Sequence, residues 1–160
     1  MPKLVPYFSA NNNMISNMAN VRGLPVGYMV GAGYYDIMSA RASDVFFSFN
    51  IHSTGPGHIG LFMLPTLSSA ACGIYGQTCA QFGANYQVLA DTAYYTNLQE
   101  LAMIPCSSSG TFEFWAGSIT NLYGNLPPKF CLAVANFTAA AFDASASHEM
   151  WSAYSYYEYV

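Results

Sequence analysis

Two stretches near the C-terminus, residues 130–137 (FCLAVANF) and 150–160 (MWSAYSYYEYV), decide the fold class of this chain. Both consist of apolar, aromatic and small residues with almost no charge. A run that is apolar at successive positions predicts a strand that is buried on both faces or that touches another subunit. The second run stays apolar to its last residue, so we expect it to pair within a sheet or to dock on a neighbour.

The chain carries far less charge than a typical soluble domain. Of its 160 residues, 53% are apolar, 16% are aromatic and only 8% are charged, whereas soluble domains contain about 25% charged residues. A lone monomer needs surface charge for solubility. The shortage therefore predicts a surface covered by copies of the chain, by other partners or by lipid.

Lipid is the least favoured of these covers. No run of 18 apolar residues is present, so we expect no membrane-spanning helix. Residues 1–6 (MPKLVP) contain two prolines and lack the apolar segment of a signal peptide, which predicts that the chain is not exported by that route.

Basic residues are too few for a nucleic-acid interface. The net charge is −4, and the basic residues Lys3, Arg22, Arg41 and Lys129 are scattered along the sequence. Each neutralised phosphate needs a cationic partner. We therefore expect little or no direct binding of nucleic acid.

The four cysteines, Cys72, Cys79, Cys106 and Cys131, show no CxxC spacing. This pattern predicts buried free thiols in a protein that folds in the cytosol. A disulfide between Cys72 and Cys79 is an alternative, and a zinc site is a weaker one.

Apolar and polar residues alternate through residues 44–52, which predicts a half-buried strand. A turn signal at residues 53–57 (STGPG) and an apolar run at 58–64 follow, so the two strands are expected to form a hairpin. Further strands are expected at residues 26–38, 85–90, 111–116, 130–137 and 150–160.

Glycines at positions 27, 31 and 33 predict that the strand at 26–38 contains a bulge or bend. The one predicted helical turn covers residues 96–103, where Thr96 and Gln99 occupy capping-box positions. Seven or eight short strands with one helical turn predict an all-β fold, an antiparallel β-sandwich built as an eight-stranded jelly roll. We expect an extended N-terminal arm over residues 1–25 and a single β-sandwich domain over residues 26–160.

Three segments of the closing third share a further pattern: residues 110–115 (GTFEFW), 126–138 (LPPKFCLAVANFT) and 151–159 (WSAYSYYEY). They resemble the last strands of single jelly-roll capsid proteins of small icosahedral viruses, in which a strand ending near Asn-x-Thr precedes a short excursion and a final strand rich in Tyr and Glu. The resemblance implies a subunit that folds in the host cytoplasm and assembles into a virion through loops and terminal arms.

One departure from that family concerns the arm. Many such coats carry a basic arm for the genome, whereas residues 1–25 hold only Lys3 and Arg22 as basic residues. Either another component neutralises the genome, or the chain is an outer, vertex or spike-type subunit.

Signals for catalysis are missing from the sequence. It contains no GxSxG, HExxH, P-loop or CxxC motif, so we expect neither an enzyme nor a bound cofactor. His52 and His58 flank the predicted turn and form a candidate metal pair, with two strand-end histidines as the alternative interpretation. His148 is expected at a solvated strand end.

The sequence therefore predicts a structural protein that self-assembles into a viral shell or vertex with copies of itself and other capsid subunits. Its contacts would bury aromatic and small apolar side chains. The residues expected at the subunit interface are Leu4, Val5, Tyr7, Phe8, Tyr154, Tyr156, Tyr157 and Tyr159.

The alternative function is a lectin-like β-sandwich module, because thirteen tyrosines can present aromatic faces to sugars. Asn136-Phe137-Thr138 matches a glycosylation sequon. Since it lies in a predicted strand, we do not expect it to carry a glycan.

Overall fold

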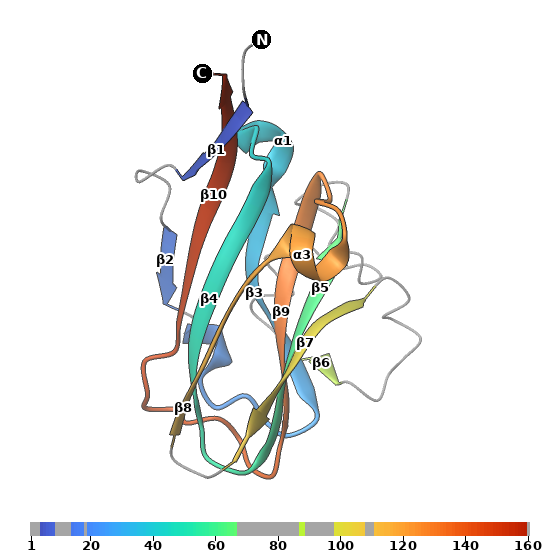
Figure 1. Cartoon of the computed structure of the whole chain (residues 1–160). Coiled ribbons are helices and arrows are strands. Elements are labelled where there is room, and N and C mark those ends of the chain that lie inside the picture. Colours follow the sequence, from blue (N-terminus) through green and yellow to red (C-terminus); the bar gives the residue numbers. More distant parts are fainter. Residues whose placement is uncertain are drawn as a thin grey trace.

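A computed structural model shows a sandwich of two antiparallel sheets (Figure 1). The structure describes the backbone of residues 4–8, 14–17, 19–66, 87–88, 98–107 and 111–159. Side chains are described for residues 19–66 (except 33 and 40), 98–107, 113 and 117–156. The predicted all-β sandwich is confirmed.

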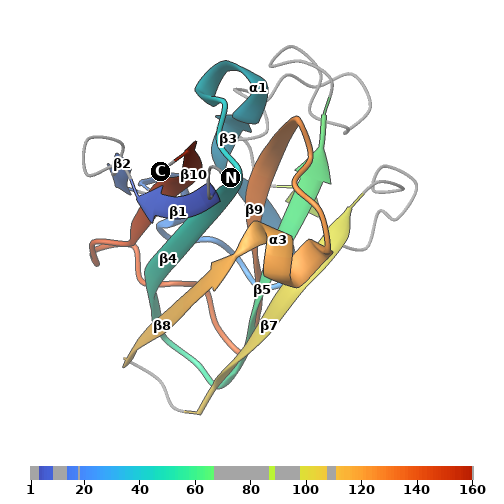
Figure 2. The ribbon, with the colours of Figure 1, turned by 45° about the horizontal axis from the view of Figure 1, so that its top comes forward.

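Each sheet contains five strands within the described residues. The first has the order β1-β10-β4-β8, with β2 also paired to β10: β1 (Leu4–Phe8), β2 (Met14–Asn17), β10 (Glu149–Tyr159), β4 (Asp44–Ser53) and β8 (Thr111–Ser118). The second has the order β6-β3-β9-β5-β7: β6 (Gln87–Val88), β3 (Tyr28–Asp36), β9 (Lys129–Thr138), β5 (Gly57–Pro65) and β7 (Gln99–Cys106). Figure 2 shows the two layers obliquely from the end that carries both termini.

The connectivity is that of a jelly roll. β2 pairs with residues 149–152 of β10 and β1 with residues 155–159, both on the edge of β10 opposite β4, so together they act as one interrupted strand. The remaining pairs join β3 to β9, β4 to β8, and β5 to β7. These are the pairs of one long antiparallel hairpin rolled into two sheets, as in the predicted fold.

The strand periodicities place the core. Val45, Phe47, Phe49 and Ile51 of β4 are buried in the space between the sheets, as their alternation predicts. β9 is buried on both faces. Alternate residues Phe130, Leu132 and Val134 belong to the main core, whereas Cys131, Ala133 and Ala135 join a second apolar cluster with Met29, Phe62 and Leu64.

The predicted hairpin over residues 44–64 is wrong, although both of its strands are present. β4 belongs to the first sheet and β5 to the second, so the turn between them crosses from one sheet to the other. Both strands bury an apolar face against the common core. The alternation of apolar and polar residues indicates which face of a strand is buried. It does not indicate whether the next strand lies beside it in the same sheet or across from it in the other sheet.

The predicted helical turn at residues 96–103 is also wrong, because β7 begins at Gln99. Pairing between β5 and β7 shifts register at Leu61/Phe62, opposite Glu100 and Ala102. This bulge separates the buried residues Leu101 and Ile104 by three positions, a spacing that imitates a helix. A second register shift, between Gly31 and Gly33 of β3, confirms the predicted bulge there.

The described helices lie instead at strand ends: 3-10 helix η2 (Ala19–Val21), α1 (Ile37–Ala40) and α3 (Ile119–Tyr123). Ser118 caps α3 by accepting a hydrogen bond from the Asn121 N–H at 3.2 Å, and Gly124 ends it with a φ of 86°. The carboxylate of Asp44 accepts from the Ser118 hydroxyl and from the Thr120 N–H, so the start of β4 fixes the start of α3.

A buried amide secures the connection that leaves β9. The Asn136 side-chain NH₂ donates to the carbonyls of Leu24 at 2.8 Å and Ala140 at 2.9 Å, and its oxygen accepts from the Thr138 N–H at 2.9 Å. Asn136 is fully buried. One side chain thus ties the segment before β3 to the segment after β9.

Asn136→Ala should lower the free energy of unfolding by about 3 kcal/mol, since it removes the three hydrogen bonds given above from a buried site and leaves the Thr138 N–H without this acceptor. The measurement is urea denaturation of the purified protein. Asn125→Ala, at an exposed position after α3, is the control and should change stability by less than about 0.5 kcal/mol. Equal effects of the two substitutions would contradict the role assigned to Asn136.

Gly57 should tolerate no side chain. Its φ is 139°, and an added Cβ would lie 2.5 Å from the Phe137 carbonyl oxygen. We expect Gly57→Ala to cost about 3 kcal/mol, from backbone strain and displacement of β9. Gly124 has a φ of 86°, but an added Cβ would have nothing within 4 Å, so Gly124→Ala should lower the free energy of unfolding by only about 1 kcal/mol. Thermal melts of both variants test this difference, and a smaller loss at Gly57 than at Gly124 would refute it.

Candidate functional site

The residues predicted at the subunit interface lie on two neighbouring strands. β1 pairs antiparallel with the end of β10, with Leu4 opposite Tyr159, Tyr7 opposite Tyr156 and Phe8 opposite Ser155. The arm residues Leu4, Val5, Tyr7 and Phe8 therefore lie beside the strand that carries Tyr154, Tyr156, Tyr157 and Tyr159. Both chain ends lie at the same end of the sandwich (Figures 1 and 2).

The range predicted as an arm, residues 1–25, contains two kinds of structure. β1 and β2 pair with β10 alone among the described strands. Val21 and Leu24 are fully buried in the main core. Only the part of the range before η2 is thus attached through a single strand, along an edge of the first sheet.

Tyr154, one of the predicted interface tyrosines, packs on the core of its own subunit. Its ring meets Tyr35 edge-on, with centroids 6.5 Å apart. Burial raises the pKa of Tyr154, and stronger burial raises the pKa of Tyr35 to about 12. Tyr156 is half-buried, and the side chains of Tyr157, Tyr159 and the four arm residues lie outside the described part of the structure.

The outer face of the first sheet is poor in charge. Register places Trp151 beside Ser48 and Ala153 beside Phe46, and Phe46 is 36% exposed. The other described residues of that face between positions 46–52 and 149–153 are Asn50, His52 and Glu149. Glu149 is thus the one carboxylate among these positions, and the face combines the apolar side chains Phe46, Trp151 and Ala153 with the polar side chains Ser48, Asn50 and His52.

Charged side chains elsewhere are used within the chain. Lys129 and Asp36 form an ion pair at 3.2 Å across β9 and β3. The Asp36 carboxylate also accepts from the Ser39 N–H at 3.0 Å and caps α1. Hydrogen bonding to Ser39 first, and Lys129 second, lowers the pKa of Asp36. These contacts pair the charges of Lys129 and Asp36 with groups of the same chain.

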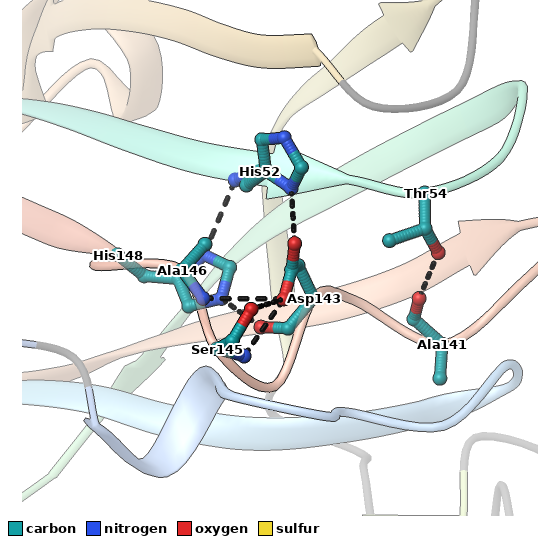
Figure 3. A network of polar contacts seen from close by, with 7 residues as sticks. All are labelled: His52, Thr54, Ala141, Asp143, Ser145, Ala146 and His148. Atoms are coloured by element: carbon teal, nitrogen blue, oxygen red, sulfur yellow. Dashed lines mark hydrogen bonds and ion pairs between the residues drawn. The ribbon is translucent and has the colours of Figure 1, made fainter.

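A polar cluster lies at the opposite end of the sandwich, where the connection between β9 and β10 meets the end of β4 (Figures 1 and 3). The His52 N–H donates to Nδ1 of His148 at 3.2 Å, and Nε2 of His148 lies 2.7 Å from the Asp143 carbonyl oxygen. These contacts assign a neutral His148 ring with its proton on Nε2.

The prediction of a solvated His148 is wrong, since its side chain is fully buried. Both ring nitrogens have backbone partners, which is the condition for burying an imidazole. The sequence carries no signal for this arrangement, because the partners of His148 are main-chain groups supplied by tertiary packing.

Asp143 organises the cluster. Its carboxylate lies 3.0 Å from Nδ1 of His52, and it accepts from the Ser145 N–H and hydroxyl, each at 2.7 Å, and from the Ala146 N–H at 3.2 Å. The hydrogen bonds from Ser145, supported by Ala146 and His52, lower the pKa of Asp143 to about 2. The local turn can be predicted from Asp143 and Ser145, but the contact of the Asp143 carboxylate with His52 cannot.

The candidate metal pair is not assembled. His52 lies on the first sheet against Asp143, whereas His58 is exposed on the second sheet, opposite Pro105 and Phe137 in register. Within the described residues no group of three or more His, Cys, Asp or Glu side chains is placed to hold a metal ion.

Cys106 and Cys131 are buried free thiols, as expected. Burial raises the pKa of both, that of Cys131 to about 12, so neither is prepared as a nucleophile. Cys72 and Cys79, the predicted alternative disulfide, lie outside the described residues. The sequon residue Asn136 is buried and its amide is engaged in the contacts given above.

Among the described residues, none of the helices is long and apolar enough to cross a membrane. Comparison with known proteins adds no family: no protein-family model matches the sequence, and no curated protein matches it significantly.

Proposed function

We propose that this protein is a structural subunit that assembles with copies of itself, and with other shell subunits, into the capsid or the vertices of a virion. It performs no chemical step in this role. The observation that carries the proposal is a jelly-roll sandwich whose first sheet has an outer face with one carboxylate, Glu149, among the positions given above and with the exposed aromatic residue Phe46.

The small number of charged residues supports assembly over a function as a monomer. Only 8% of the residues are charged, and Asp36, Asp44, Lys129 and Asp143 make contacts within the chain. An obligate contact buries about 2,000 Å² or more in total, and the chain exposes 8144 Å². A few such contacts would cover a large part of this surface, and few charges would have to be desolvated on the way.

The edge of β10 supplies a route for assembly. It is completed by two short strands, β1 and β2, that pair with no other described strand. Edge strands are sites where chains join through backbone hydrogen bonds. β1 and β2 can therefore leave or extend the sheet without breaking any other described strand pair, and the terminal residues beside them are the proposed subunit contacts.

A glycan-binding module is the second candidate, favoured by one described feature. Phe137 is 37% exposed on the second sheet, its ring lies edge-on to Phe62 at 6.3 Å, and exposed His58 is its register neighbour. An exposed aromatic ring beside a polar side chain is a platform for a sugar. A single-chain mass at micromolar concentration together with saccharide binding that is lost in Phe137→Ala would favour this candidate.

Removal of residues 1–18 should leave a folded sandwich that does not assemble, because β1 and β2 pair only with β10 among the described strands. Circular dichroism should show an unchanged β spectrum. Sizing with light scattering should shift from the mass of an assembly to that of a single chain. A synthetic peptide of residues 1–18 added to the truncated chain is the control, and it should restore assembly at least in part. Particles formed equally well without residues 1–18 would rule out the arm's role.

Phe46→Glu should raise the critical concentration for assembly at least tenfold, because it replaces an exposed aromatic side chain on the outer face of the first sheet with a charge. Its stability should change by less than about 1 kcal/mol, since the side chain is partly exposed. Met103→Glu is the matched control: Met103 is 41% exposed on the second sheet, and this variant should assemble normally. The reverse pattern would move the contact to the second sheet and contradict this assignment.

A further inference from the structure

The polar cluster fastens the connection between β9 and β10, residues 139–148, to the end of β4 and the turn beyond it (Figure 3). The Asp143 N–H donates to the His52 carbonyl at 3.3 Å, and the His52 N–H donates to Nδ1 of His148 at 3.2 Å. The Thr54 hydroxyl donates to the Ala141 carbonyl. The connection is thus fixed by polar contacts along its length.

An apolar anchor lies under these contacts. Phe142 is buried in the main core, its N–H donates to the Leu24 carbonyl at 3.1 Å, and its ring centroid is 6.3 Å from that of His148. The His148 ring, at the end of the connection, therefore covers part of the buried Phe142 ring. Any change that displaces the His148 ring also uncovers this part of the core.

We propose that His148 is an acid-sensitive latch: a second proton on its ring, at Nδ1, detaches residues 139–148 from the end of β4 while the two sheets stay folded. The step is a proton uptake from solvent with no other bond made or broken except hydrogen bonds. Once Nδ1 carries a proton, two donors, Nδ1–H and the His52 N–H, face one another. The ring also becomes a cation without access to water.

The charged groups around His148 act on its protonated ring in both directions. His52 on β4 and Arg22 after η2 disfavour a positive charge on the ring, whereas the Asp143 carboxylate on the connection itself favours it. The Asp143 carboxylate is already engaged by His52, Ser145 and Ala146. Burial first, with His52 and Arg22 adding to it, lowers the pKa of His148 despite the hydrogen bond to the Asp143 carbonyl.

The direction of the pH effect follows from this lowered pKa. A detached or unfolded chain binds the proton near the ordinary histidine value of about 6.5, whereas the closed latch binds it only at lower pH. The latch is therefore fully closed above about pH 6.5, and its stability is lost as the pH falls below that value. Asp143 acts in a separate window: its contribution is present above pH 3.8 and is lost as the pH falls through about 2.

The test is hydrogen exchange of the full chain at pH 7.5 and pH 5.0, read by NMR as protection factors so that the intrinsic pH dependence of exchange cancels. The amides of His52, Phe142 and Asp143 should lose at least tenfold in protection at pH 5.0. The amide of Val134 in the centre of β9 should keep its protection. Ring nitrogen shifts of His148 in the same samples should report protonation of Nδ1 over the same interval.

Substitution separates the histidines. In His148→Asn, the amide oxygen can accept from the His52 N–H without titrating, so protection at residues 139–148 should no longer depend on pH between 7.5 and 5.0. His58→Asn, at an exposed position, is the matched control and should behave as the unmodified chain does.

Three results would overturn the latch: unchanged protection of the unmodified chain at pH 5.0, a pH response that persists in His148→Asn, or simultaneous loss of protection in β9. If His148→Asn does not fold, the NMR shifts of the His148 ring nitrogens in the unmodified chain decide whether the proposal holds. A His148 ring that stays neutral until the whole sandwich unfolds would also refute the proposal. None of these outcomes depends on whether the protein forms a shell.

Discussion

Burial of β9 on both faces is the constraint on which the rest of the structure depends. Phe130, Leu132 and Val134 enter the core between the sheets, while Cys131, Ala133 and Ala135 join the second apolar cluster on the other side. A strand with no polar face has to be central, and β9 lies between β3, which pairs with its residues 129–135, and β5, which pairs with its residues 130–138. Once β9 is central, the remaining strands of its sheet follow, and the first sheet packs across its inner face.

Strand positions were predictable because they depend on local pattern. Alternation in β4 and the continuous apolar run in β9 identify these strands from the sequence alone. The errors arise where tertiary geometry decides. The turn after Ser53 crosses between sheets instead of closing a hairpin, and a register shift in the β5–β7 pair gives Leu101 and Ile104 a helical spacing. Neither feature leaves a mark on the composition of its segment.

The candidate site also contains one part that could be predicted from the sequence and one part that could not. The C-terminal segment was predictable as an apolar strand, whereas the N-terminal segment was predicted only as an extended arm and contains β1 and β2, which pair along β10. The polar cluster was not predictable: His52, Asp143 and His148 come from separate segments, and backbone groups supply both partners of the His148 ring. A buried histidine and a solvated one look the same in a sequence when their partners are main-chain atoms.

The rolled-hairpin connectivity has a consequence for how the protein is made. Every strand pair in the first sheet except β4–β8 needs β10, which follows all the other described strands in the sequence, and β3 must wait for β9. The first sheet therefore cannot be completed until β10 has been synthesised, and folding has to bring distant parts of the chain together. Because β1 and β2 pair only with β10 in the described structure, this edge of the first sheet is completed last. The first two described strands of the chain therefore find their partner strand only after all the others have been synthesised.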